Sequence, residues 1–354
     1  MRLQNLNSAK LALLFRREFD LCKVTAGETV VLLSDLTSRR EYVAAAFAAA
    51  SDLGADIYEM CVNQVPSWTN VGVPTIGACK GTLEAIVAAD LLVCLHGAFF
   101  TGWVQRVREA GTRVLLAVDH PDDLEQLMAP PRLKEAVLHA DRRLADTKIM
   151  RIVSNAGTDL SVACGDYPVM SQYGYADEPG RMDQWGVGHV HTFPNEGSAN
   201  GRVVIAPGDI IILPYCRYVV DEIRLEIRDG FIREIDGGLD AKLMRDWLAE
   251  HQTDAADLDP FAVSHLGWGL NPQARWDCLA LYGDDPERGY AATRAFPGNF
   301  LFSTGPNNQG GGTRTTRGHY DVPMRDCTIM LDNDVIVDAG RIVDDLMVVA
   351  AQLR

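Results

Sequence analysis

An alternation of short apolar runs with stretches of helical period, between about Lys23 and Asp146, limits the possible folds of this chain more than any other feature. The apolar runs have the length of buried strands, and amphipathic stretches separate them. Strands joined by helical crossovers pair in parallel, because the connecting helices cover the faces of the sheet. We therefore predict an α/β fold whose N-terminal domain, residues 1–148, contains a doubly wound parallel sheet. The four apolar runs are ETVVLLSD, ADIYEMCV, DLLVCL and TRVLLAV.

The stretch SRREYVAAAFAAASDLG carries the strongest helix signal of this domain. Ser38 and Glu41 have the spacing of a capping box, in which each side chain accepts a hydrogen bond from the other residue's backbone N–H. Gly54 can adopt the left-handed conformation that ends many helices. We predict a helix that is capped by Ser38 and stops at Gly54.

Charge and motif content exclude several kinds of partner. The 354 residues carry a formal net charge of −15 and a pI near 4.9, so nucleic acid and anionic membranes would be repelled. The turn after the first apolar run, LTSRRE, lacks the glycines of GxGxxG or GxxxxGK. Without those glycines a pyrophosphate cannot approach the backbone closely. We expect a small-molecule partner and no nucleotide cofactor.

The N-terminal segment and the cysteines predict a cytoplasmic protein. Residues 1–20 carry Arg and Glu within their apolar pattern, so they lack the uninterrupted core of a signal peptide or a membrane anchor. The 8 cysteines are scattered and form no CxxC pair, as expected for reduced thiols. Each half of the chain is long enough to bury a core without disulfides, so a bound metal would be catalytic rather than structural.

After about residue 148 the pattern changes to β-rich segments. Asp229-Gly230 supplies the positive φ angles of a tight hairpin between two of them. A helix is expected from about Ala241 to His251, followed by a long irregular stretch from Pro260 to Arg325. We predict a β-rich α+β domain over residues 149–354. The segments are KIMRIVSN, TDLSVACG, RVVIAPGDIIILP and EIRLEIRDGFIREI.

Two sets of His and acidic residues offer metal ligands in this second domain. His319 and Asp321 lie two residues apart, so in an extended segment both side chains point to the same side. With His265 they would form the two-His, one-carboxylate set that leaves open positions on non-haem iron. Spacing alone does not choose between this set and a second one. The competing set consists of His189, His191 and Glu196.

Five sequence blocks distinguish the second half of the chain. They are YGYADEPGRMDQW, FPNEGSANG, SHLGWGLNPQARW, GNFLFSTGPN and HYDVPMRDC. Together and in this order, they resemble the 2,5-dihydroxypyridine 5,6-dioxygenases of bacterial nicotinate and nicotine degradation. The resemblance is firm over about residues 165–335 and extends to the N-terminal domain mainly as a shared alternation of elements. More distantly, the chain is similar to the thermophilic-type leucyl aminopeptidases.

The resemblance implies an activity and a metal. A mononuclear Fe(2+) site, held by His265, His319 and Asp321, would cleave the ring of 2,5-dihydroxypyridine with O₂ in an extradiol-type reaction that yields N-formylmaleamate. Both oxygen atoms would enter the product, so neither NAD(P)H nor 2-oxoglutarate would be needed. The resemblance also implies a homo-oligomer.

The resemblance further implies residues that act on the substrate. His96 follows a predicted strand, where open α/β sheets present ligand-binding groups, and is expected to be the base toward the substrate hydroxyl. Glu178 and Ser303 are candidates to hydrogen-bond the ring. His189 and His191 lie outside the family's ligand set, so they either line the pocket or pack. Glu196 fits a family block, with a role beside the metal or in the structure left open.

Two other functions remain as alternatives. A metalloaminopeptidase would use one or two divalent ions to activate water. Two-metal hydrolysis needs additional bridging carboxylates, and the SHLGWGL block supplies His265 where a peptidase would favour Glu. A non-catalytic oligomeric binding protein would bind no metal. Metal analysis separates the three possibilities.

Overall fold

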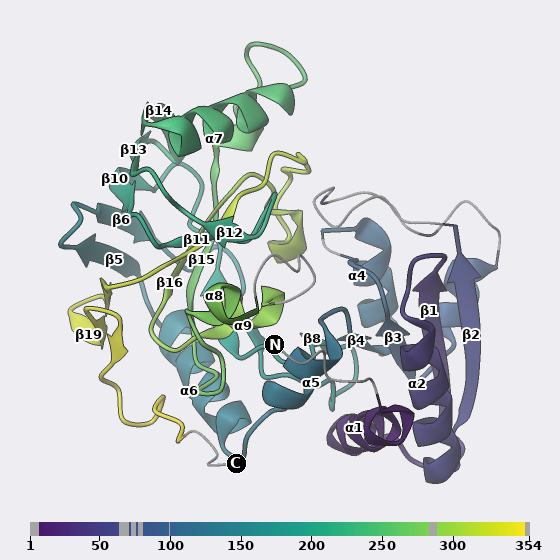
Figure 1. Ribbon diagram of the computed structural model, residues 1–354. Coiled ribbons are helices and arrows are strands. Elements are labelled where there is room, and N and C mark those ends of the chain that lie inside the picture. The colour runs from purple at the N-terminus through teal and green to yellow at the C-terminus, as the bar shows by residue number, and fades with distance from the viewer. Residues whose placement is uncertain are drawn as a thin grey trace. The chain divides into compact units, whose positions relative to one another are not determined.

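The computed structural model describes residues 7–63, 71, 76, 81–98, 100–282 and 289–350. The chain forms two compact units, which Figure 1 colours from purple at the N-terminus to yellow at the C-terminus. The first unit contains Met1–Ala129 and Gly174–Gly186, and the second contains Pro130–Tyr173 and Val187–Arg354. The predicted α/β fold class, with a parallel sheet first and antiparallel sheets later, is confirmed.

The first unit is built on a five-stranded sheet in the order β2-β1-β3-β4-β8, with every neighbouring pair parallel. Side chains that alternate along β1 enter two different cores. Val30 and Leu32 pack with α1 and α2 on one face, and Val31 and Leu33 pack with α3 and α4 on the other. Helices on both faces make the sheet doubly wound, as predicted. The strands are β1 (Thr29–Asp35), β2 (Asp56–Val62), β3 (Leu91–Cys94), β4 (Arg113–Leu116) and β8 (Met182–Gln184), and the helices are α1 (Ser8–Leu21), α2 (Arg40–Leu53), α3 (Thr82–Val87), α4 (Gly102–Glu109) and α5 (Pro121–Gln126).

The start of α2 differs from the predicted capping box. The helix begins at Arg40 after Arg39, which makes no side-chain capping bond. The hydroxyl of Ser38 instead donates to the carboxylate of Asp35 at 2.9 Å and closes the turn that follows β1. Asp35, three residues upstream, thus accepts the hydrogen bond of the hydroxyl that was predicted to cap the helix. The predicted end is confirmed, since Gly54 has a φ of +74°.

The division of the chain differs from the predicted boundary between residues 148 and 149. Helix α6 (Leu133–Ala145) belongs to the second unit, because it packs against β7 and β9 of that unit. Strand β8 returns to the first unit, because it pairs in parallel with β4. Both facts depend on contacts between distant parts of the sequence, which local patterns do not report.

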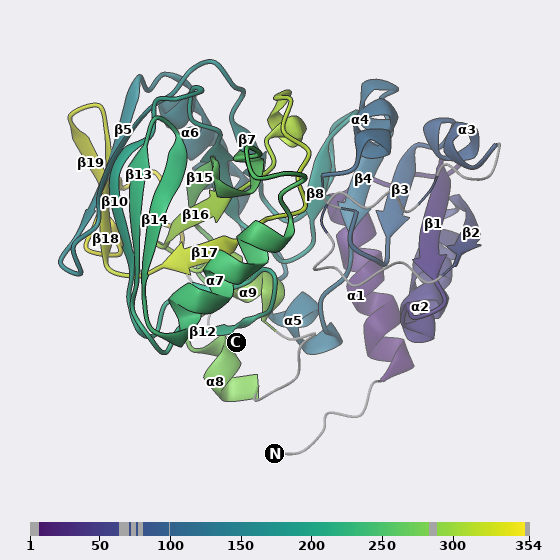
Figure 2. The same ribbon diagram turned by 90° about the horizontal axis from the view of Figure 1, so that it is seen from above.

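The second unit contains three antiparallel sheets, the smallest of which pairs β11 with β12, and strands of the two larger sheets can be followed in Figure 2. An eight-stranded sheet has the order β14-β13-β10-β6-β5-β18-β19-β20, and a five-stranded sheet has the order β17-β16-β15-β9-β7. The predicted hairpin is confirmed, with φ values of +53° at Asp229 and +82° at Gly230. The strands are β5 (Ile149–Ser154), β6 (Asp159–Ala163), β7 (Met170–Gln172), β9 (His189–Thr192), β10 (Asn200–Ile205), β11 (Ile210–Ile211), β12 (Arg217–Tyr218), β13 (Ile223–Arg228), β14 (Phe231–Gly237), β15 (Val263–Gly269), β16 (Phe300–Thr304), β17 (Asp321–Met324), β18 (Cys327–Leu331), β19 (Asp334–Asp338) and β20 (Arg341–Ile342).

The stretch from Pro260 to Arg325 is not irregular, so that prediction was wrong. It supplies β15, β16 and β17, which are adjacent in the five-stranded sheet. Every residue of these three strands is buried. Such strands lack the alternation of apolar and polar residues that marks a half-exposed strand. The predicted helix near residues 241–251 is present as α7 (Leu239–Glu250), and the remaining helical segments are η1 (Asp259–Phe261), α8 (Cys278–Tyr282), α9 (Tyr290–Ala295) and η2 (Asn308–Gly310).

Two features bear on the environment of the chain. Across the described ranges, none of the helices combines the length and apolarity that a bilayer crossing requires. The cysteines within those ranges are all free thiols; they are Cys22, Cys61, Cys94, Cys164, Cys216, Cys278 and Cys327. Cys79 lies outside the described residues.

A substitution of Trp185 tests whether Gly174–Gly186 forms part of the first unit. The Trp185 side chain is fully buried, its ring centroid lies 5.0 Å from that of Phe15, and its Nε1–H donates to the carbonyl of Leu124 at 3.0 Å. Trp185→Ala should therefore lower the free energy of unfolding by about 3–5 kcal/mol, as for other aromatic-to-Ala changes in cores. Urea denaturation followed by circular dichroism measures this loss. Trp185→Phe keeps a buried ring and should lose less, and an unchanged midpoint in the Ala variant would contradict the assignment.

Candidate metal centre

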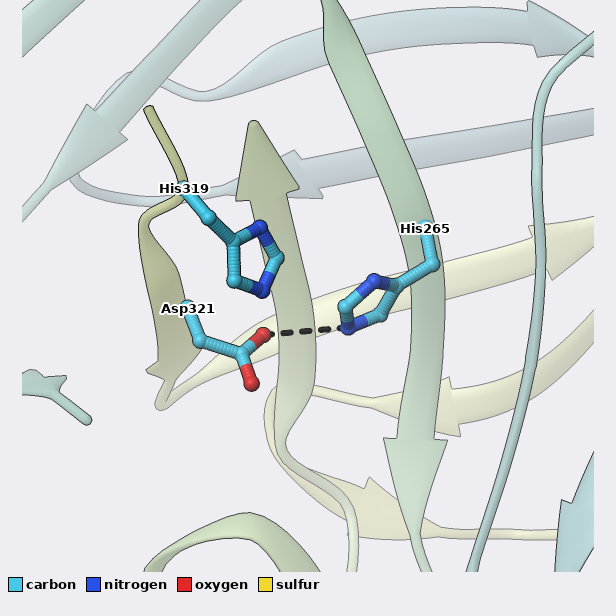
Figure 3. Close-up of side chains that lie close together, drawn as sticks. All are labelled: His265, His319 and Asp321. Atoms are coloured by element: carbon cyan, nitrogen blue, oxygen red, sulfur yellow. Dashed lines mark ion pairs between the residues drawn. The ribbon is translucent and has the colours of Figure 1, made fainter. Parts of the chain in front are cut away.

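The five-stranded sheet of the second unit brings three potential metal ligands together. His265 lies on β15, Asp321 begins β17, and His319 precedes it by two residues. All three side chains are buried, and one ligand atom from each lies within 4.8 Å of the others. Figure 3 shows the two imidazole rings and the carboxylate pointing toward one another. Within the described ranges, no second group of His, Cys, Asp or Glu side chains meets the same distance criterion.

An irregularity in strand pairing directs His265 into this group. Val263 pairs with Thr304 and Leu266 pairs with Phe302, so two residues of β15 face one residue of β16. Such a bulge bends the strand and re-aims a side chain. The hydroxyl of Ser303, the residue opposite the bulge, donates to the carbonyl of His265 at 2.8 Å. Ser303 is fully buried and holds the bulged backbone in place.

The tautomer of His319 follows from its hydrogen bond. Nδ1 lies 2.6 Å from the carbonyl oxygen of Thr304. Because a carbonyl can only accept, Nδ1 carries the proton, and Nε2 has the lone pair that could bind a metal. Burial lowers the pKa of His319 to about 4, so the imidazole is neutral near pH 7.

The two carboxylate oxygens of Asp321 have different surroundings. Oδ2 accepts a hydrogen bond from Nη2 of Arg294 at 2.6 Å. Oδ1 lies 3.0 Å from Nε2 of His265 and has no hydrogen-bond partner among the described residues. Burial raises the pKa of Asp321, but the charge of Arg294 and the contact with His265 outweigh this effect. The pKa therefore lies below its ordinary value, and the carboxylate is charged near pH 7.

These donor atoms fit a divalent cation. A buried carboxylate oxygen without a hydrogen bond is costly, and an ion between it and the two imidazoles would satisfy it. Two His and one carboxylate are the donors of mononuclear non-haem iron sites, in which the remaining positions stay open. The chemistry of the donor set thus agrees with the metal that the sequence resemblance implied.

The competing histidines lie next to the triad instead of forming a separate set. His189 and His191 are on β9, where His191 pairs with Gly267 of β15. Nε2 of His189 lies 2.9 Å from Nδ1 of His191, and the ring centroid of His191 lies 4.8 Å from that of His265. Both rings are buried, and burial lowers both pKa values well below the ordinary value.

Glu196 does not join either group. Its exposed side chain accepts hydrogen bonds from the hydroxyl of Tyr167 at 2.8 Å and from the amide of Asn307 at 2.7 Å, and it pairs with Arg314. Arg314 also donates to the carbonyls of Gly305 and Val263. This network ties the glycine-rich loop before His319 to the start of β15.

His96 and Glu178 lie in the first unit, whereas the triad lies in the second. His96 follows β3 and is buried, with Nδ1 3.4 Å from the carbonyl of Gly97. Nε2 is buried and has no hydrogen-bond partner among the described residues. Burial lowers the pKa of His96, so the ring is neutral near pH 7. Glu178 is exposed in the segment that precedes β8.

Two residues that shape the site, Arg294 and Gly267, were not identified from the sequence. Arg294 lies 27 residues before Asp321 on the short helix α9, and no spacing rule links them. Gly267 carried a detectable signal, because a glycine in a strand often marks a close backbone approach. A Cβ there would lie 1.9 Å from the carbonyl oxygen of Val190, so only glycine allows β9 and its histidines to pair with β15.

Comparisons with known proteins agree with this picture. A profile of the family NicX, 2,5-dihydroxypyridine 5,6-dioxygenase, matches residues 10–344. The 2,5-dihydroxypyridine 5,6-dioxygenase of Pseudomonas putida KT2440 is 37% identical over 345 residues, which cover 95% of this chain and 97% of that protein. A solved structure of 2,5-dihydroxypyridine dioxygenase from the same strain matches with a TM-score of 0.90 and 37% identity, covering 97% of this chain and 99% of the other.

AmpT from Thermus thermophilus matches with a TM-score of 0.62 at 13% identity, covering 95% of this chain and 99% of that one, and shares the fold. The fold and the full-length matches define the protein as a dioxygenase. More narrowly, the chain belongs to the 2,5-dihydroxypyridine 5,6-dioxygenase family. The resemblance predicted from the five sequence blocks is confirmed, and the more distant likeness to thermophilic-type aminopeptidases holds at the level of the fold.

The buried imidazoles predict a dependence of stability on pH. The folded-state pKa values of His189, His191 and His319 are lowered, so the unfolded chain binds more protons below about pH 6.5. Their contribution to stability is present above that pH and is lost as the pH falls, by about 1.4 kcal/mol per pH unit for each proton. Changing both His189 and His191 to Phe should flatten the fall between pH 7 and pH 5. Urea titrations of metal-free protein measure the slope, and an unchanged slope would contradict the expectation.

Proposed function

We propose that the protein is a mononuclear non-haem Fe(II) dioxygenase that opens the ring of 2,5-dihydroxypyridine between C5 and C6. The observation that carries this proposal is the buried group of His265, His319 and Asp321 in a member of this family. The products balance: the substrate and one O₂ give N-formylmaleamate, and both oxygen atoms enter it without an external reductant. We place the enzyme in cytoplasmic nicotinate and pyridine degradation, as a homo-oligomer.

The donor set supports iron among the divalent metals. Two imidazole nitrogens and one carboxylate oxygen suit Fe(II) and leave neighbouring positions free. When bound, Fe(II) supplies those positions and the electron transfer between ring and O₂. The chain supplies the dry surroundings, since all three ligands are buried, and the fixed orientation of His319 by Thr304.

Side chains of the protein must orient the substrate. The two ring hydroxyls are para to one another, so they cannot both bind one ion side by side, and side chains must hold the ring. His189 and His191 are proposed to line the substrate side of the metal, because His191 lies against His265 and Nδ1 of His189 is buried without a hydrogen-bond partner among the described residues. Glu178 remains a candidate for contact with the ring. We assign Ser303 to the positioning of His265, since its hydroxyl already donates to that backbone.

His96 is proposed as the base that takes a proton from the substrate hydroxyl. A base must be neutral before it acts, and burial lowers the pKa of His96 below its ordinary value. Its Nε2 has no hydrogen-bond partner among the described residues, so its lone pair is not engaged. Its place after β3 is where parallel sheets present groups to ligands.

A hydrolase of the aminopeptidase type is the competing function. Two-metal hydrolysis needs carboxylates that bridge the ions. In the described part of the chain, Asp321 is the single carboxylate in the ligand group. This composition favours a mononuclear site and the dioxygenase reaction.

The ligand assignment is tested by single changes of His265, His319 and Asp321 to Ala. Each should remove bound iron and activity while the fold survives, because each unit has its own core. Metal analysis after anaerobic Fe(II) reconstitution, together with O₂ consumption on 2,5-dihydroxypyridine, measures both. The matched control is the double change of His189 and His191 to Phe, which should keep the iron. Full metal content in His319→Ala would reject the assignment.

The base assignment is tested by His96→Ala. The variant should bind Fe(II) normally and bind substrate only modestly less tightly. It should turn over about 10²–10⁴-fold more slowly, the usual contribution of a general base. Activity should recover in part at higher pH, where solvent removes the proton. Near-normal turnover across the pH range would place the base elsewhere.

A further inference from the structure

The strongest unassigned feature of the site is the buried arginine behind Asp321. Arg294 lies on α9, and its side chain is 10% exposed. Its Nη2 donates to Oδ2 of Asp321 at 2.6 Å and to the hydroxyl of Tyr290 at 2.7 Å. The guanidinium carbon also lies 4.9 Å from the centre of the Tyr290 ring. A buried guanidinium with these partners is confined to one position.

The backbone that carries Arg294 is fixed as well. The side-chain amide of Asn299 donates to the carbonyl of Arg294 at 2.9 Å and to that of Phe296 at 2.7 Å. Asn299 is fully buried, and a Cβ at Gly269 of β15 would lie 2.5 Å from its amide nitrogen. The end of α9 is therefore held against the strand that presents His265.

This arrangement gives the two oxygens of Asp321 different tasks. Oδ2 is occupied by Arg294, whereas Oδ1 is directed toward His265, as the dashed line in Figure 3 marks. Carboxylates bind metals through one oxygen or through both, and the second mode uses an additional coordination position. On an octahedral ion, the second carboxylate oxygen would occupy a position that O₂ or the substrate could otherwise take.

We propose that Arg294 is a positioning residue that restricts Asp321 to binding the metal through Oδ1 alone, so that one more coordination position stays open for O₂. The inference rests on the proposed iron site. The guanidinium suits this task because it stays charged and has a rigid planar set of donors. A neutral side chain at position 294 would release Oδ2, which could then turn onto the ion.

The test uses Arg294→Met and Arg294→Lys in the full-length enzyme, with Arg181→Met as the matched control. Arg181 also pairs with a fully buried carboxylate, that of Asp183, at 2.9 Å and with a side-chain exposure of 13%, but it lies in the first unit. The control therefore reports the general effect of breaking a buried ion pair. Three readouts are taken: metal content, the visible absorption spectrum of the Co(II)-loaded protein, and nitric oxide binding to the anaerobic Fe(II) protein by electron paramagnetic resonance.

Arg294→Met should keep its metal, change the Co(II) spectrum toward a different coordination, and bind nitric oxide roughly tenfold more weakly, within the usual range for partners of metal ligands. Arg181→Met should match the wild type in both spectra. A wild-type Co(II) spectrum and nitric oxide affinity in metal-loaded Arg294→Met would overturn the proposal.

If Arg294→Met does not fold or does not hold metal, Arg294→Lys decides the question, because it keeps the charge and loses the planar donors. An altered Co(II) spectrum with weaker nitric oxide binding in this variant supports the proposal. A wild-type spectrum, or loss of metal in this variant too, overturns it. Failure of the wild-type protein itself to bind Fe(II) would instead reject the proposed function.

Discussion

The antiparallel pairing of β15 between β9 and β16 is the constraint on which the site depends. The bulge opposite Ser303 turns His265 toward Asp321, and Gly267 lets β9 approach closely enough to place its histidines beside it. Every residue of β15 and of its two neighbours is buried, so the pairing that positions His265 lies within the packed interior of the unit. The site is therefore a property of the sheet more than of its loops, and this favours a fixed geometry for the metal.

Burial of so many titratable groups in one place has an electrostatic cost that the structure meets in two ways. His319 and the histidines of β9 stay neutral, since burial lowers their pKa values, and neutral rings are much cheaper to bury than charged ones. Asp321 keeps its charge, because Arg294 balances it at 2.6 Å. The charged carboxylate of Asp321 and the neutral ring of His319 thus lie in one group with His265, a combination of donors that suits a divalent cation.

Local patterns in the sequence predicted the parallel sheet, because its strands and helices have different patterns. Strand β1 is a short apolar run, and helix α2 has the apolar spacing of a helix. Such patterns failed for β15, β16 and β17, since fully buried strands have no alternation, and for β8, since its pairing with β4 joins distant residues. The proposed metal ligands were favoured by family resemblance and not by spacing. Neither local patterns nor the family resemblance identified Arg294. A single arginine on a short helix forms no motif, and its role can be inferred only from its contact with Oδ2 of Asp321.

The histidines of the competing set, His189 and His191, lie in the same sheet as His265. His191 pairs with Gly267, two residues beyond His265, so the second pair of histidines packs against the first set. A choice between the two pairs of histidines from sequence was therefore poorly posed, because His191 packs against His265, and only the group of His265 and His319 includes a buried carboxylate. Glu196, the acid of the competing set, is exposed and bound to Arg314, so it cannot complete a buried site. Among the described residues, the buried carboxylate of Asp321 distinguishes the group of His265 and His319 from the histidines of β9.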